Sequence, residues 1–303
     1  MIRFNDVGKT YASLRGAPVR AVEGMTLDVE AGEVFGIAGP NGAGKTTMIA
    51  MMLGFLPPST GRIMVDGLAP RAFVERYGMG YLSELIAINP RWRTRESLVR
   101  LATLAGLPAD ALDARVDELL ALLGLEEHAR KRTKELSKGT LQRLGLAQAL
   151  LRDERVLILD EPTHGLDPLW TQQFRELVPR LRRPDRAIVV ASHNLDELER
   201  LADRVAIVDR GRLQRIVSTR GDMGATATRY RLVARASASL VEEIFPGATA
   251  ASGNGEFDLR VTDIIALNRG LAALIARGAL LVSVAPAFSS LEEQFRQAVG
   301  EGQ

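Results

Sequence analysis

Short apolar runs alternate with amphipathic stretches over the first two thirds of the chain. Unbroken apolar runs, typical of parallel strands buried on both faces, occur at residues 156–159, 187–191 and 205–208. Alternating apolar positions predict further strands at residues 3–4, 21–29 and 34–37. Helical spacing predicts helices at residues 111–123, 140–151 and 171–181. This order of elements indicates an α/β domain over residues 1–217.

A second, smaller region follows the α/β domain. Residues 218–229 are small, polar and glycine-containing, which predicts a linker. Beyond it, strands are expected at residues 230–234, 256–261 and 280–284. Helices are expected at residues 239–244, 264–276 and 289–299, the last opened by a capping box of Ser290 and Glu293. Residues 230–303 therefore form a small α+β domain.

Composition narrows the class of protein. The 303 residues are 46% hydrophobic and 25% charged, as in ordinary globular proteins, and the net charge of +2 gives no support to nucleic-acid binding. The chain has no cysteine, which excludes disulfides, thiolate metal sites and catalytic thiols. Its most apolar stretch, residues 48–56, is about half as long as a membrane span requires, and its start lacks a signal-peptide pattern. We expect a protein that neither spans a membrane nor is exported.

Residues 39–46 carry the strongest chemical motif. Their sequence, GPNGAGKT, matches G-x-x-x-x-G-K-[ST] between a strand-like segment and a helix-like one, the context that a phosphate loop requires. Gly42 and Gly44 allow backbone N–H groups to converge on phosphates. Lys45 supplies a charge to the β- and γ-phosphates, and the Thr46 hydroxyl is a ligand for Mg²⁺. The alternative, a glycine-rich turn that matches by chance, is disfavoured by these flanks.

Two carboxylates follow the buried strand predicted at residues 156–159. Ligands bind at the carboxyl ends of strands in open α/β sheets, so Asp160 and Glu161 are expected to face the phosphate loop. Asp160 is then a partner for Mg²⁺, and Glu161 a general base for the attacking water. A solvated junction between strand and turn is the alternative if the pair is considered alone.

His193 ends another apolar strand, AIVVASH. At that position an imidazole can contact the γ-phosphate and the attacking water. A lone histidine more often has a structural role, which is the interpretation that the sequence favours for His128 and His164.

The order of these motifs resembles that of the ATP-binding cassette (ABC) ATPases. The resemblance covers residues 1–216 and rests on the phosphate loop and four further segments. These are LSKGTLQR at 136–143, similar to the signature LSGGQ; LILDEP at 157–162; GLD at 165–167, like the D-loop; and SH at 192–193, like the H-switch. It implies a P-loop NTPase fold with a mixed or parallel sheet and a helical signature subdomain.

The resemblance also implies roles for individual residues. Catalysis is assigned to Glu161, His193, Lys45 and Glu84. Mg²⁺ is assigned to Thr46, Asp160 and Glu84. Contacts with ATP are assigned to Tyr11, which matches the aromatic that stacks on adenine, and to Gly39, Asn41, Gly42, Ala43, Gly44, Lys45, Thr46, Thr47, Ser137, Gly139 and Asp167.

The signature segment predicts a second subunit. Ser137 and Gly139 precede the helix expected from Thr140, and the N-terminus of a helix suits an anion. The chain already has one phosphate loop, so the resemblance implies that the signature closes over ATP held by a second ATPase subunit, head to tail. A homodimer is favoured over a heterodimer.

Three positions depart from the family pattern. Lys138 replaces the third signature residue, a glycine, and Thr140 replaces the fifth, a glutamine. Glu84 stands where the Q-loop glutamine is expected. A carboxylate accepts a hydrogen bond from a metal-bound water but cannot donate one as glutamine does.

Two segments point to a membrane partner. Trp92, flanked by Arg91 and Arg93, falls where the family receives a short helix of the integral membrane subunit; packing within the helical subdomain is the alternative. The ending LLVSVAPAFSSLEEQF resembles the C-terminal extension of ABC-2-type exporter ATPases. The resemblance therefore implies an ATPase at the cytoplasmic face of a membrane that powers an exporter.

Two other functions are weaker alternatives. A soluble ABC-type ATPase acting on ribosomes or DNA usually has two cassettes or a long coiled-coil insertion, whereas this chain has one cassette and no sustained heptads. A nucleotide-binding regulator without turnover is disfavoured by Glu161.

Overall fold

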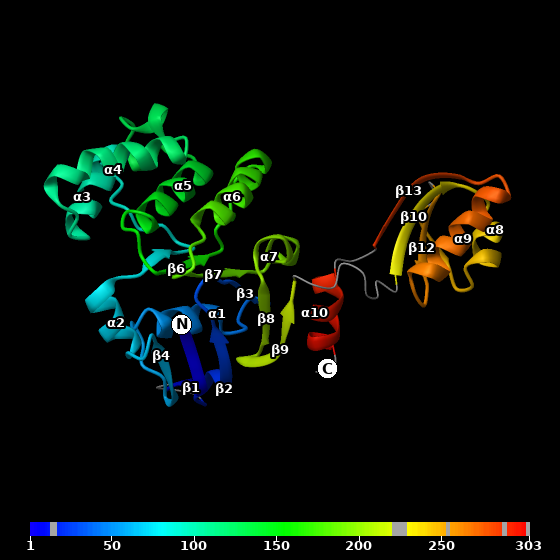
Figure 1. Cartoon of the computed structure of the whole chain (residues 1–303), viewed down its shortest axis with the longest axis horizontal. Helices are drawn as coiled ribbons and strands as arrows, with labels where there is room; N and C mark the ends of the chain where they lie inside the picture. The colour runs from blue at the N-terminus through cyan, green and yellow to red at the C-terminus, as the bar shows by residue number, and fades with distance from the viewer. Residues whose placement is uncertain (13–16, 220–228, 253–254, 287–289, 301–303) are drawn as a thin grey trace. The chain divides into compact units, whose positions relative to one another are not determined.

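The computed structural model describes residues 1–12, 17–219, 229–252, 255–286 and 290–300. The chain divides into two compact units, Met1–Val217 and Ser218–Gln303 (Figure 1). Residues 220–228, most of the expected linker, lie outside the described residues. Each unit is therefore a separate body with its own core.

A six-stranded sheet forms the centre of unit 1. Its strands, in spatial order, are β5 (Gly80–Leu82), β6 (Val156–Asp160), β7 (Ala187–Ser192), β3 (Val34–Ala38), β8 (Arg204–Asp209) and β9 (Arg212–Ser218). The four pairs from β5 to β8 are parallel, and every residue of β3, β6 and β7 is buried. Unbroken apolar sequence is what such strands require, since helices or a second sheet cover both faces.

A second sheet and one buried helix complete this core. Strands β2 (Val19–Val29), β1 (Ile2–Tyr11) and β4 (Thr60–Val65) pair antiparallel in that order. Helix α1 (Lys45–Met52) contributes Met48, Ile49, Met51 and Met52 to a cluster that includes side chains of both sheets. Four of its eight side chains are therefore buried apolar groups, whereas its first turn carries the polar residues Lys45, Thr46 and Thr47.

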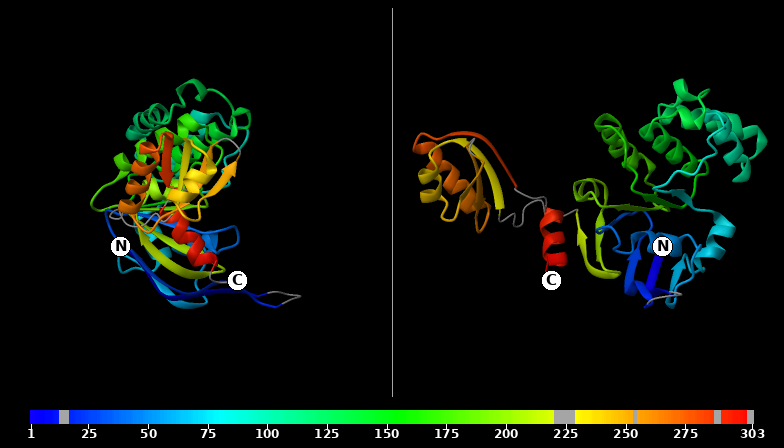
Figure 2. Two further views of the ribbon diagram at one scale, coloured as in Figure 1. Left: turned by 90° about the vertical axis from the view of Figure 1, so that its right-hand side faces the viewer. Right: turned by 180° about the vertical axis from the view of Figure 1, so that it is seen from behind.

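The remaining helices of unit 1 fall into two groups. Helices α3 (Thr94–Leu104), α4 (Ala109–Leu122) and α5 (Lys138–Ala149), with the short helices η1 (Glu126–His128) and η2 (Thr133–Glu135), gather at the end away from β1, β2 and β4 (Figures 1 and 2). Helices α2 (Pro70–Tyr77) and α7 (Leu195–Leu201) lie nearer the sheets, and α6 (Pro168–Leu181) lies beside α5 in the view of Figure 1. The expected α/β class with a helical subdomain is confirmed.

Helix α5 begins earlier than the sequence predicts. Ser137 is its N-cap, and its side chain accepts a hydrogen bond from the backbone N–H of Thr140 at 3.2 Å. Gly139 consequently lies in the first turn and not before it. The cap decides this boundary, since a serine oxygen satisfies an N–H that the helix leaves unpaired.

Unit 2 is an antiparallel sheet with helices against it. Its strands are ordered β11 (Thr249–Ser252), β12 (Glu256–Arg260), β10 (Arg229–Arg235) and β13 (Leu280–Pro286). Helices α8 (Ala238–Ile244) and α9 (Ile264–Ala276) share a core with these strands. Helix α10 (Ser290–Gly300) follows, but the side chains of its expected capping box, Ser290 and Glu293, lie outside the described residues. Among the described helices, none is long and apolar enough to cross a bilayer.

The strand register places the ends of β3, β6 and β7 side by side at one edge of the large sheet. Ala38 at the end of β3 lies beside Ser192 at the end of β7, and Asp160 at the end of β6 lies beside Ala191. The segments that follow these strands therefore leave the sheet at the same edge. They begin with Gly39, Glu161 and His193.

Candidate functional site

A pocket of about 450 Å³ opens at this edge of the sheet. It is lined by Ala21, Pro40, Asn41, Gly42, Ala43, Gly44, Lys45, Thr46, Thr47, Glu84, Asp160, Glu161, His164 and His193. The structure thus brings the residues of the phosphate loop together with all the carboxylates assigned to catalysis or metal binding. The lining residues come from five segments between Ala21 and His193, so the tertiary fold assembles the pocket.

The phosphate loop adopts a backbone that only small residues tolerate. Gly42 and Gly44 have φ values of +82° and +103°, and a Cβ atom on Gly44 would lie 2.5 Å from the carbonyl oxygen of Ala21. The Lys45 ammonium donates to the carbonyl of Gly39 at 2.6 Å and is almost fully buried. Helix α1 begins at Lys45, so its positive N-terminal end also faces the pocket.

Asp160 carries the most perturbed ionisation in the pocket. Its side chain is 3% exposed, and its pKa is raised to about 6. Burial is the largest cause, the neighbouring carboxylates of Glu161 and Glu84 act in the same direction, and Lys45 acts in the opposite direction. A buried carboxylate among like charges favours a bound cation, so the electrostatics suit a divalent metal at Asp160.

Glu161 is held in a fixed position beside His193. Its carboxylate lies 2.8 Å from Nδ1 of His193 and accepts hydrogen bonds from the His193 backbone N–H at 3.0 Å and the Ser192 hydroxyl at 3.2 Å. These partners all come from the end of β7. The contact links the assigned general base to the assigned histidine directly.

The turn after β6 also shows strain at Glu161. This residue has a φ of +48°, which non-glycine residues rarely adopt and which costs of order 1–3 kcal/mol. Gln142 of α5 donates to the carbonyl oxygens of Glu161 and Pro162 at 3.1 and 3.2 Å. Sequence reasoning missed Gln142, because nothing local distinguishes it from a helix-surface glutamine.

His164 is a second residue that the sequence analysis did not connect with the pocket. A structural role is favoured from sequence, whereas the structure places the imidazole at the pocket wall. Its Nε2 lies 2.9 Å from the Lys138 ammonium and its Nδ1 lies 3.9 Å from the Glu84 carboxylate. Its spacing, three residues after Glu161, was the available signal.

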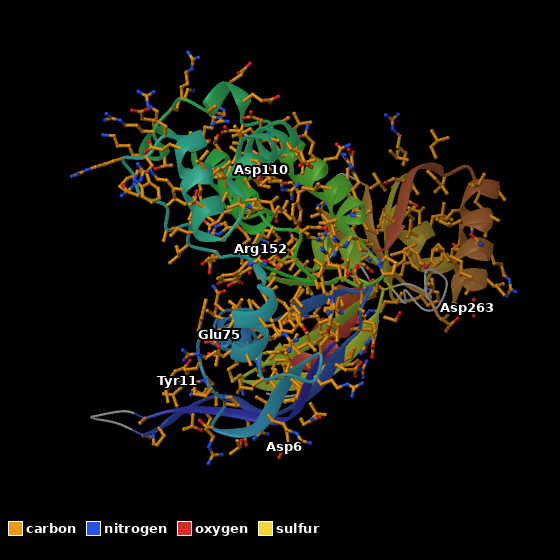
Figure 3. The ribbon with its side chains drawn as sticks, turned by 60° about the vertical axis from the view of Figure 1, so that its left-hand side comes forward. Asp6, Tyr11, Glu75, Asp110, Arg152 and Asp263 are labelled. Atoms are coloured by element: carbon orange, nitrogen blue, oxygen red, sulfur yellow. The ribbon has the colours of Figure 1, made fainter. Side chains whose placement is uncertain are left out.

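The other assigned residues lie outside this pocket or at its margin. The Tyr11 hydroxyl is 3.4 Å from the hydroxyl of Thr47, and the ring is 41% exposed (Figure 3). Ser137 caps α5, and Asp167 caps α6 by accepting from the N–H of Trp170. Ser137, Gly139 and Asp167 therefore do not line the phosphate-loop pocket of their own chain.

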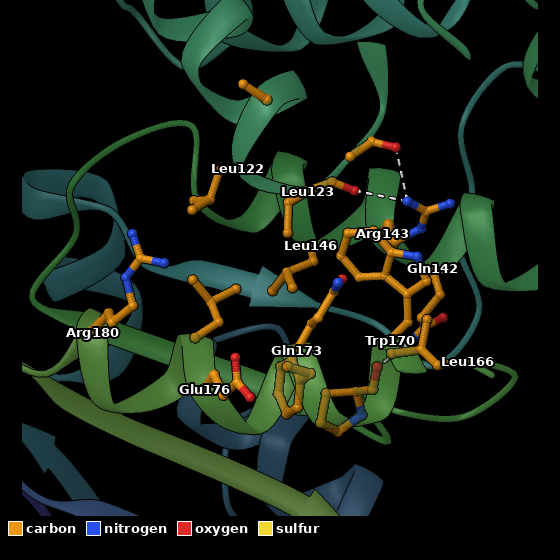
Figure 4. A pocket seen from close by; sticks show the side chains of 15 residues that line it. Leu122, Leu123, Gln142, Arg143, Leu146, Leu166, Trp170, Gln173, Glu176 and Arg180 are labelled. Atoms are coloured by element: carbon orange, nitrogen blue, oxygen red, sulfur yellow. Dashed lines mark hydrogen bonds between the residues drawn. The ribbon is translucent and has the colours of Figure 1, made fainter. Parts of the chain in front are cut away.

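A second hollow, of about 320 Å³, lies between α4, α5 and α6 (Figure 4). Arg143 of α5 donates to the carbonyls of Leu123 and Gly124 at 2.9 Å and stacks 4.0 Å from the Trp170 ring. These contacts tie the end of α4 to α5 and α6. The hollow lies at the interface between the helical subdomain and α6, and it shares no lining residue with the phosphate-loop pocket.

Comparison with known proteins identifies the family. The family model described as "ABC transporter" matches residues 22–164. The ABC transporter ATP-binding protein NatA of Bacillus subtilis is 34% identical over 215 residues, which cover 70% of this chain and 87% of that protein. The chain belongs to the ATP-binding subunits of ABC transporters.

Other relatives of this ABC subunit serve transport in both directions. A methionine import ATP-binding protein of Caulobacter vibrioides is 40% identical over 222 residues, covering 70% of this chain. A Nod factor export ATP-binding protein of Rhizobium etli is 36% identical over 213 residues, again 70% of this chain. The match spans 65% and 66% of the lengths of those two proteins.

Solved structures of ABC cassettes share the fold of this ABC subunit. A bacterial ABC transporter cassette solved as a dimer superposes with a TM-score of 0.68 at 24% identity, over 73% of this chain and all of that one. An ATP-binding subunit of an ABC transporter gives 0.63 at 28% identity, over 72% of this chain and 90% of that one. The covered share is close to the extent of unit 1.

The pocket of this ABC subunit fits Mg²⁺ only together with phosphates. Among the described residues, no group of three or more histidine, aspartate or glutamate side chains is placed to hold a metal by itself. Thr46, Asp160 and Glu84 line one pocket. Mg²⁺ is commonly bound through one or two carboxylates plus substrate phosphates, which is what these residues offer.

The burial of Asp160 predicts a pH-dependent gain in stability for Asp160→Asn. Above pH 6 the folded wild type must bury a charge, whereas below about pH 3 both folded and unfolded states are protonated and no penalty remains. Without nucleotide and metal, Asp160→Asn should raise the free energy of unfolding by about 2–3 kcal/mol at pH 7.5 and by about half that at pH 5. Both tryptophans, Trp92 and Trp170, lie in unit 1, so tryptophan fluorescence in urea reports this transition.

The exposed Asp6 supplies the control for this prediction. Asp6 has a positive φ of +49°, which asparagine tolerates equally well (Figure 3). Asp6→Asn should change stability by less than about 0.5 kcal/mol at either pH. If Asp160→Asn raised the free energy of unfolding by the same amount at pH 7.5 and pH 5, burial of the ionised carboxylate could not be the cause of the gain.

Proposed function

We propose that this chain binds Mg-ATP in the phosphate-loop pocket and hydrolyses it. The observation that carries the proposal is the meeting of Lys45, Asp160 and Glu161 in one pocket from distant parts of the sequence. Lys45 and the amides at the start of α1 offset the charge of the β- and γ-phosphates. Family membership supports the same activity.

Each residue of the pocket has a distinct task in this proposal. Thr46 and Asp160 hold Mg²⁺, which when bound neutralises phosphate charge; Glu84 acts on its hydration shell. Glu161 orients the attacking water and takes its proton. The contact of 2.8 Å between His193 and Glu161 keeps that carboxylate aligned and lets His193 respond to the γ-phosphate. Tyr11 stacks on adenine.

We also propose that two copies of the cassette bind nucleotide between them, head to tail. Ser137 and Gly139 lie at the N-terminus of α5, which suits an anion, yet they do not line the pocket of their own chain. A second copy that presents its own phosphate loop supplies the missing anion. Asp167, at the start of α6, then faces the same interface. The dimeric cassette with the same fold is a precedent for this arrangement.

The proposed partner of this dimer is an integral membrane subunit, and the proposed direction is export. Trp92 is half-buried and the Arg100 guanidinium lies 5.1 Å from its ring, so an aromatic surface remains for a partner helix. The relatives include subunits for import and for export, so the direction rests on the likeness of the C-terminal segment to exporter extensions. The soluble ATPase is the competing function.

Replacing the general base should abolish turnover and keep binding. Glu161→Gln should lower the ATPase rate by a few hundredfold or more, on the scale of general-base contributions, because an amide cannot accept the water's proton. The dissociation constant for Mg-ATP should change less than about threefold. Phosphate release and a fluorescent-nucleotide titration measure the two quantities. Glu75→Gln, on exposed α2, is the control (Figure 3).

An unchanged ATPase rate in Glu161→Gln would contradict the proposed hydrolysis and favour a regulator that binds nucleotide without turnover.

A charge at the signature position should prevent dimer formation. Glu161→Gln with ATP is expected to elute as a dimer in size-exclusion chromatography, because hydrolysis no longer reopens it. Adding Ser137→Asp keeps the helix cap but places a negative charge against the partner's γ-phosphate, so the double variant should elute as a monomer that still binds ATP. Ser237→Asp, the same change at the N-cap of α8, should leave the dimer intact. Dimers with Ser137→Asp would refute the head-to-tail contact.

Affinity purification should separate the transporter from the soluble alternative. From detergent-solubilised membranes, the full chain should recover a protein with about six apolar spans. Trp92→Ala should lose that protein while retaining basal ATPase activity, whereas Phe55→Ala, at an exposed aromatic in another part of unit 1, should keep both. Recovery of ribosomes or DNA in place of a membrane protein would favour the soluble ATPase.

A further inference from the structure

Three polar side chains form a line from the phosphate-loop pocket to the start of α5. Glu84 follows β5, His164 lies in the turn between β6 and α6, and Lys138 is the first residue of α5. Nε2 of His164 is 2.9 Å from the Lys138 ammonium, and Nδ1 is 3.9 Å from the Glu84 carboxylate. One imidazole thus stands between a cation and an anion.

The local packing holds Lys138 against this turn. A Cβ atom on Gly165 would lie 2.7 Å from Cδ of Lys138, so the lysine stem lies across a position that only glycine leaves open. A Cβ atom on Gly139 would lie 2.8 Å from the Gly165 carbonyl oxygen. The first turn of α5 and the turn that carries His164 are therefore in close contact, which favours one direction for the lysine.

Helix stability gives no reason for a lysine at this position. A cation in the first turn opposes the helix dipole, at a cost of about 0.3–1 kcal/mol. A residue that breaks a local rule in this way calls for a compensating contact elsewhere. His164 supplies that contact.

The Glu84 carboxylate also needs a compensating contact, because it is an anion in a pocket proposed to bind phosphates. It lies close enough to Asp160 to raise the pKa of that carboxyl, and it lines the pocket proposed to receive a triphosphate. A free carboxylate there repels the phosphates, as like charges do at short range. A cation connected to it reduces that repulsion and limits its movement.

We propose that His164 is a positioning residue that joins Lys138 to Glu84 within one chain and holds the Glu84 carboxylate for nucleotide binding. Because the Lys138 ammonium donates to Nε2, the imidazole is neutral with its proton on Nδ1, 3.9 Å from the Glu84 carboxylate, so its contact with Glu84 is a charge–dipole attraction and not a hydrogen bond. The link also ties the pocket to the turn that begins with Ser137. The inference rests on the proposed binding of Mg-ATP in this pocket.

A double-mutant cycle on the full chain tests the inference. His164→Ala and Lys138→Ala should each raise the KM for ATP about fivefold and change kcat less than about twofold, since they act on binding through Glu84. In a Glu84→Gln background, which lacks the charge to be offset, each effect on KM should fall below about twofold. His164→Gln should restore a near-normal KM, because its amide both accepts from Lys138 and donates to Glu84.

Controls separate this inference from a structural effect and from the proposed function. His128→Ala and Lys134→Ala, the same changes in the helical subdomain, should leave KM unchanged, and tryptophan fluorescence should show that His164→Ala unfolds like the wild type. The inference is overturned if His164→Ala raises the KM for ATP equally in the wild-type and in the Glu84→Gln background. It is also overturned if His164→Gln has the raised KM of His164→Ala. Wild-type chain that hydrolyses no ATP refutes the proposed function instead.

Discussion

The parallel pairing of three buried strands is the constraint on which the site depends. Strands β3, β6 and β7 are buried along their whole length, so their backbone groups must be satisfied by neighbouring strands. Parallel pairing in this register ends all three at one edge of the sheet. The phosphate loop, Glu161 and His193 meet there because the strands that precede them cannot shift without breaking the core.

The pocket concentrates charge that the fold alone does not neutralise. Asp160, Glu161 and Glu84 share it with Lys45, and burial together with the two neighbouring carboxylates raises the pKa of Asp160 to about 6. Burial of like charges destabilises a folded protein unless a cation joins them. Together with the strained backbone at Glu161, this pattern is typical of a site whose most stable form contains its ligand.

Helix α5 carries the residues that we propose meet a second cassette. Ser137 satisfies the first N–H groups of α5 by capping, which fixes where the helix begins and which residues its first turn presents. Gln142 of the same helix holds the turn at Glu161, and Lys138 reaches His164 on that turn. The helix therefore touches the catalytic turn of its own chain with one set of residues while Ser137 stays available for another molecule.

The sequence alone determined whatever depends on local spacing and on burial. The phosphate loop, the carboxylates after an apolar strand and the two-part architecture follow from patterns within about 20 residues, where backbone geometry and the hydrophobic effect act. Tertiary structure alone decided that His164 lines the pocket, that Gln142 supports Glu161 and that Lys138 meets an imidazole 26 residues away. Such contacts join side chains from separate elements, and their distances are set by how the elements pack, which no local pattern encodes.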